Sequence, residues 1–149
     1  MAHARKQVRD ALATLLTGLA TTADRVYVAR VTPIPADELP ALAITLDDET
    51  IELGSASSPV IWNRTAFARV QGLAALLDGL DDELDQIALE IEQAVAGDAT
   101  LLGGVLNEPL RLVTIEPERS AEGERPVGRI TLTFLARYET TAAAPDVTL

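Results

Sequence analysis

The sequence predicts an α+β fold: a two-layer sandwich in which a mainly antiparallel or mixed β-sheet packs one face against two main helices. Segments 4–19 and 80–97 repeat apolar residues at helical spacing, whereas the segments between and after them alternate apolar and polar residues. Strands joined mainly by hairpins, with helices long enough to cover one sheet face, are typical of this class. With 149 residues, 48% of them apolar, one hydrophobic core is expected. We therefore expect residues 1–141 to form one domain and residues 142–149 an irregular, disordered tail.

The first helix is predicted over residues 4–19. Val8, Leu12, Leu15 and Leu19 recur at the spacing of one helix face. Positive charge gathers in the first turns, which is the unfavourable end of the helix dipole, and a partner at this end would offset the cost. The positively charged residues are Arg5, Lys6 and Arg9.

The first strands are predicted over residues 25–31 and 41–46, on either side of a proline-rich surface loop. Proline lacks the N–H that a strand donates to its neighbour, so residues 33–40 are expected to leave the sheet. The second strand is expected to end at an acidic cluster, and a separate third strand to run from Thr50 to Leu53. The cluster consists of Asp47, Asp48 and Glu49.

A long extended segment is predicted over residues 63–76. Phe67 lies on one of its faces, and Arg64, Ala66, Ala68 and Val70 lie on the other. The single tryptophan, Trp62, precedes it at a loop-to-strand junction. Two interpretations stay open: Trp62 caps the core from the sheet edge, or it anchors a contact with another chain.

The second helix is predicted over residues 80–97, because its apolar residues keep helical spacing and Gly97 ends the pattern. Asp81 and Asp82 suit its N-terminus as capping residues and dipole partners. The apolar residues are Leu80, Leu84, Ile87, Ala88, Ile91 and Val95.

The chain is predicted to close with an antiparallel pair of strands, 110–117 and 130–138, joined by the polar loop 118–126. Alternation in the last strand assigns one face to the core and leaves the other face polar. The core face consists of Ile130, Leu132, Phe134, Ala136 and Tyr138.

The composition favours a protein without catalysis, cofactor or metal. The only histidine, His3, lies close to the N-terminus, and there is no cysteine to serve as nucleophile or ligand. The carboxylates at 81–85 are successive helix positions, which do not converge on one ion. A formal charge of −11 with a single lysine disfavours affinity for nucleic acid. No run of 18 apolar residues suggests a membrane span, so we expect a soluble, cytosolic protein.

Four segments, taken in order, resemble the tail terminator family of long-tailed phages. This is the family of minor tail protein U in lambda-like siphophages and of the equivalent in gene transfer particles. The segments are RKQVRDALATLLTGL, DELPALAIT, LDDELDQIALEIEQAV and LRLVTIEPERSAEGERPVGRITLTFLARYET, which together span nearly the whole chain. The closest local matches are LDDELDQIA and the G-x-x-P-x-G entry to the last strand.

The resemblance implies a structural virion protein at the neck end of the tail, assembled in the host cytoplasm. Six copies of a small α+β subunit would form a ring on the completed tail tube. The ring would stop addition of tube protein and offer its other face to head completion proteins of the neck. No cofactor, membrane contact or catalysis is implied.

A closed ring needs two different, complementary patches on each subunit. Arginines on exposed strand faces are candidates for one patch, acidic clusters for the other, and Trp62 for an apolar anchor. The alternative is that these are solvated charges. The candidate interface residues are Trp62, Arg64, Arg69, Arg111, Glu118, Glu122, Glu124, Arg125, Arg129 and Arg137, with Asp47, Asp48, Glu49 and Glu116 as further acids.

Six copies at −11 each would carry −66, so we expect DNA to pass through the ring without specific binding. Two other functions stay open. One is a head–tail connector or neck protein, whose subunits are similar in size and class. The other is a small-ligand binding module that uses a cavity between sheet and helices.

Overall fold

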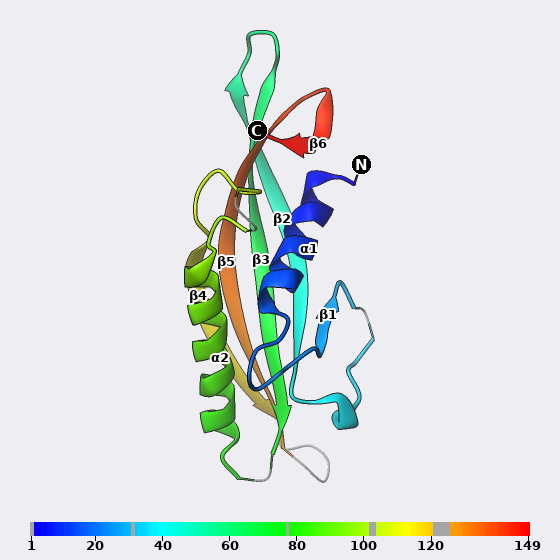
Figure 1. Ribbon diagram of the computed structural model, residues 1–149, viewed down its shortest axis with the longest axis vertical. Helices are drawn as coiled ribbons and strands as arrows, with labels where there is room; N and C mark the ends of the chain where they lie inside the picture. Colours follow the sequence, from blue (N-terminus) through cyan, green and yellow to red (C-terminus); the bar gives the residue numbers. More distant parts are fainter. Residues whose placement is uncertain (1, 31, 77, 102–103, 121–125) are drawn as a thin grey trace.

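The computed structural model describes residues 2–30, 32–76, 78–101, 104–120 and 126–149. Within these residues, two helices and six strands share one hydrophobic core (Figure 1). The elements are α1 (Ala4–Leu16), β1 (Val26–Val28), the short 3-10 helix η1 (Ala36–Glu38), β2 (Ala41–Ser55), β3 (Ile61–Ala75), α2 (Leu80–Gly97), β4 (Arg111–Ser120), β5 (Val127–Thr141) and β6 (Ala144–Thr148). Neither helix is long and apolar enough in the described part to span a membrane.

The strands form a mixed sheet in the order β1-β2-β3-β5-β4. Among the strand pairs of the described residues, β1 with β2 is the only parallel one. The centre of the sheet is the antiparallel pair of β3 and β5, which match from Ile61 opposite Thr141 to Ala75 opposite Val127 without a shift. The short β6 pairs with the last residues of β5.

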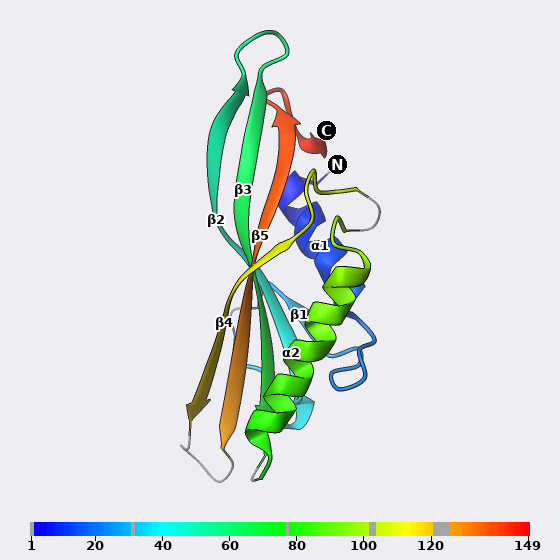
Figure 2. The same ribbon diagram turned by 90° about the vertical axis from the view of Figure 1, so that its left-hand side faces the viewer.

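Both helices cover the same face of the sheet, and they contact each other (Figure 2). The expected core face of β5 is confirmed, since its five apolar side chains are all at most 2% exposed. The structure agrees with an α+β class. The regular two-layer sandwich is not confirmed, because the sheet twists and curls towards a half-barrel.

Two glycines set the depth at which α2 packs on the sheet. Gly72 of β3 lies opposite Ile130. A Cβ atom added at Gly72 would lie 2.5 Å from the Ile87 side chain, and one at Gly128 would lie 2.8 Å from Leu84. Neither position has room for a side chain, so the helix approaches the sheet at backbone distance.

The predicted boundaries are wrong at the end of the first helix and between the second and third predicted strands. α1 ends at Leu16 and not at residue 19, because Thr17 is extended and Gly18 has a φ of 91°, which reverses the chain. The predicted strands 41–46 and Thr50–Leu53 form one strand, β2, because a bulge between Leu46 and Glu49 absorbs the acidic cluster.

The expected irregular tail is wrong for Ala144–Thr148, which forms β6. Its place is fixed by bonds to distant residues: the Leu149 N–H donates to the Glu139 carbonyl at 2.9 Å, and the Gln7 amide donates to the Asp146 carbonyl at 2.6 Å. The two chain ends therefore lie near each other (Figure 1).

The start of α2 is as predicted, but its cap differs. Asp81 and Asp82 lie in the first turn, where they face the positive end of the helix dipole. The N-cap is Gly79, with a φ of 74° and no side-chain hydrogen bond. Asp81 instead accepts from Arg119 of β4 at 2.9 Å.

Replacing Gly72 by alanine should destabilise the fold by about 1–3 kcal/mol, because the new methyl group overlaps Ile87. Urea unfolding followed by circular dichroism measures this. Gly97→Ala is the control, since a Cβ atom there meets no atom within 4 Å. An unchanged midpoint for Gly72→Ala would show that α2 does not pack this closely.

Candidate assembly surfaces

The hairpin of β2 and β3 projects past the helices as an arm, defined here as residues 50–62 (Figure 1). Ile51 lies opposite Arg64, and Leu53 lies opposite Trp62. Because residues paired across strands share a face, these side chains continue the face that the helices cover in the body. The helices do not reach them: Ile51 is 49% exposed and Leu53 is 58% exposed.

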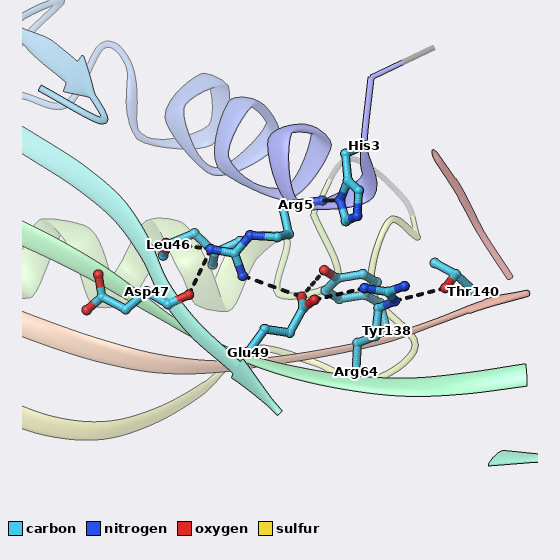
Figure 3. Close-up of polar contacts among 8 residues, drawn as sticks. All are labelled: His3, Arg5, Leu46, Asp47, Glu49, Arg64, Tyr138 and Thr140. Carbon is cyan, nitrogen blue, oxygen red and sulfur yellow. Dashed lines mark hydrogen bonds and ion pairs between the residues drawn. The ribbon is translucent and has the colours of Figure 1, made fainter. Parts of the chain in front are cut away.

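The base of the arm is held by the carboxylate of Glu49 (Figure 3). Arg64 Nη1 donates to Glu49 Oε2 at 3.0 Å, and Arg5 Nη1 lies 3.7 Å from Oε1. The Tyr138 hydroxyl also donates to this carboxylate. The side chains of Glu49 and Arg64 are only 7% and 9% exposed, so the two charges neutralise each other out of water.

The bulge in β2 makes this cluster possible. It turns Glu49 towards the core, opposite Ala66, and leaves the carbonyls of Leu46 and Asp47 to accept from Arg5 Nη2 at 2.8 Å each. Arg64 completes its contacts by donating from Nε to Thr140 Oγ1 at 2.9 Å. The start of α1, β2, β3 and β5 are thereby joined at one point.

A second buried carboxylate, Glu90 of α2, holds the loop that follows α1. It accepts from the Thr21 N–H at 2.8 Å, from the Thr21 hydroxyl and from Gln86 at 3.1 Å. Burial alone would raise the pKa of Glu90, but the hydrogen bonds from Thr21 and Gln86 outweigh burial and lower it. This cluster ties α1 to α2.

The sheet face opposite the helices, called the open face here, carries the alternate side chains of β3 and β5. Phe67 is 38% exposed on it, where a groove of about 520 Å³ passes between acidic residues. A second groove of about 450 Å³ lies between the open face and residues 30 and 32–39. The lining of this second groove includes the apolar residues Ile34, Leu39, Leu73 and Val127.

Arg64, predicted at an exposed interface, is instead buried in the Glu49 cluster. The alternation of side chains along a strand explains the error. Arg64 and Arg69 are an odd number of residues apart, five, in one strand, so they point to opposite faces of the sheet. The sequence also predicted that arginines of one subunit would pair with acids of the next. Several of these charges instead pair within their own chain. The intramolecular pairs are Arg69 with Asp47 at 2.7 Å, Arg137 with Glu108 at 3.4 Å, and Arg129 with Glu118.

The remaining predicted interface residues fall into three groups. Arg111 is exposed on β4, and none of the ion pairs found among the described residues involves it. Trp62 is partly exposed on the arm, so both interpretations of it stay open. Glu122, Glu124 and Arg125 lie outside the described residues.

Two roles at the N-terminus were missed. His3 is the N-cap of α1, where its Nδ1 accepts from the Arg5 N–H at 3.1 Å. Arg5 is a second positive partner of Glu49, beside Arg64, and this contact explains the positive charge at the start of the helix. The unfavourable positive charge at the start of the helix indicated that a partner exists, but the sequence did not identify Glu49 as that partner. Within the described residues, no group of three His, Cys, Asp or Glu side chains is placed to hold a metal.

No protein-family model matches the chain, and no curated protein matches it. Among solved structures, it is similar to a chain in the "Virion of native gene transfer agent (GTA) particle". The match has 22% identity and a TM-score of 0.48, and it covers 93% of this chain and 92% of that chain. A likeness at this level carries no functional argument.

Replacing Glu49 by alanine should cost about 3 kcal/mol of unfolding free energy, because Arg64 would stay buried without its counter-charge. Urea unfolding at neutral pH measures the loss. Glu52→Ala, on the exposed arm three residues further on, should change stability by less than about 0.5 kcal/mol. Equal effects of the two variants would contradict the role given to the cluster.

Stability should fall more steeply at alkaline pH in the wild type than in Tyr138→Phe. Burial, and next the bond to Glu49, raise the pKa of the Tyr138 hydroxyl above its ordinary 10.0. Above that pH the unfolded chain loses this proton while the folded chain keeps it, so the stability present below pH 10 is lost. Urea midpoints at pH 9 and about pH 11 test this, and parallel declines would refute it.

Proposed function

We propose that this chain is a structural virion protein of a siphophage or gene transfer particle. In this proposal it is a tail terminator, six copies of which form a ring on the end of the tail tube. The ring stops addition of tube protein and provides the surface on which the head and neck are joined. The chain performs no catalysis in this role.

The observation that carries the proposal is the arm. The arm leaves Ile51 and Leu53 of β2 in water, at 49% and 58% exposed, although β5 supports its base by pairing with β3 as far as Ile61 opposite Thr141. A monomer gains no stability from apolar side chains that stay in water. Exposed apolar groups that lie together mark contacts with other proteins. A subunit that reaches its neighbours with such an arm is consistent with the family that the sequence resembles.

The acidic composition supports a channel through which DNA moves freely. Among the described arginines, Arg64 is buried and Arg69, Arg129 and Arg137 each face a carboxylate of their own chain. Positive charge that is already paired offers little attraction to phosphate. The proposal therefore includes the tail tube protein and the head completion proteins as partners, and DNA as a passing cargo.

The direct test adds purified protein to the cognate tube protein while tubes assemble. Negative-stain images should show shorter tubes with extra density at one end, because a terminator blocks further addition. A head–tail connector would leave tube length unchanged and bind only heads or finished tails. Unchanged tubes without end density would refute the terminator.

The second groove favours one other function, a small-ligand binding module. Its volume of about 450 Å³ lies in the range of ligand pockets, and Arg30 and Arg129 border its apolar lining. A monomer in sizing chromatography whose melting temperature rises with an anionic, apolar metabolite would favour this function over the ring.

A further inference from the structure

The arm and the second groove are complementary surfaces on one chain. The arm presents Ile51, Leu53 and the partly exposed Trp62. The groove presents Ile34, Leu39, Leu73 and Val127, and it adjoins a smaller hollow that shares Leu73, Val127 and Arg129. Each surface therefore offers apolar area that its own chain leaves uncovered.

One chain cannot bring these surfaces together. The arm's apolar side chains lie on the helix-covered side of the sheet, whereas the groove lies on the open face. The two also lie at opposite ends of β3, which runs from Ile61 at the arm to Leu73 at the groove. Eleven or twelve strand residues span about 36–40 Å, too far for the arm to fold back. A contact between the two surfaces joins two copies.

The negative charge of the arm favours docking in the second groove over docking in the groove at Phe67. The only charged residue of the arm is Glu52. The Phe67 groove is lined by Asp47, Asp48 and Glu116 against a single arginine, so it would repel an acidic arm. The second groove has no acid in its lining, and its two arginines, Arg30 and Arg129, pair with Glu38 and Glu118 of their own chain, so this groove does not repel the acidic arm as the Phe67 groove would.

We propose that the arm of one copy docks in the Ile34–Val127 groove of the next copy of this chain. The contact is head-to-tail, since the two copies use different surfaces. Such a contact closes into a ring when the rotation from one subunit to the next is a whole-number fraction of a full turn. The inference rests on the proposed ring and names the surfaces that build it.

Cysteine cross-linking tests the contact, and the chain contains no cysteine to interfere. Leu53→Cys places a thiol on the arm, and Val127→Cys places one at the groove; both positions are exposed in the monomer, at 58% and 37%. Under mild oxidation, the double variant should form a ladder of oligomers on a non-reducing gel. An equal mixture of the two single variants should stop at one-to-one dimers.

The matched control pairs Leu53→Cys with Leu89→Cys, which is 46% exposed on α2 and outside the groove. This double variant should stay uncross-linked. Dimers of Leu53→Cys alone would mean that two arms pack on each other, and they would overturn the proposal. So would equal cross-linking of the control.

A second variant separates this inference from the proposed function. Leu53→Asp should keep the wild-type urea midpoint, because Leu53 is exposed, and should weaken self-association at least 10-fold in light scattering. If the variant still caps tubes and forms rings, the arm contact is wrong while the terminator function stands. If the wild type cross-links as expected but tubes are not capped, the contact stands and the function is wrong.

Discussion

The Glu49 carboxylate lies where the start of α1, the bulge of β2, and the strands β3 and β5 meet. It is almost fully buried, so it needs the positive charge of Arg64 and the further contacts of Arg5 and Tyr138. Each of these partners comes from a different element, and each element is therefore held relative to the others. The arm begins one residue beyond this cluster, so the cluster fixes the direction in which the arm leaves the body.

The parts of the fold that sequence periodicity predicted are those governed by burial on one face. Alternation in β5 identified the core from Ile130 to Tyr138, because the sheet has one covered face along that strand. The spacing of Leu84, Ile87 and Ile91 likewise identified the buried side of α2. These patterns involve residues close together in the sequence, so they can be recognised without knowing the rest of the fold.

The errors arise where distant residues decide the local structure. Asp47 and Asp48 look like the end of a strand, yet the bulge carries them through because Arg5, more than 40 residues away, takes up the freed carbonyls. The tail looked disordered because its sequence has no pattern, yet the edge of β5 supplies partners for β6. Arg64 looked like an interface residue because no local signal shows that its partner is Glu49.

The surfaces proposed for assembly could be predicted only in part. Trp62 was recognised as a candidate anchor, but Ile51 and Leu53 appeared to be ordinary strand residues until the arm was seen to pass the helices (Figure 2). Charged residues dominated the predicted interface, and the structure pairs many of them inside one chain. Apolar groups that remain uncovered are thus the better guide to where this subunit meets its neighbours.

The central claim is that copies of this chain assemble head-to-tail into a closed ring on a tube end. Electron cryomicroscopy of tail tubes incubated with the protein tests it most directly. Averaged tube ends should show one added layer with sixfold symmetry, in which each subunit's arm reaches the next subunit. Bare tube ends, or added density with twofold symmetry, would contradict the claim.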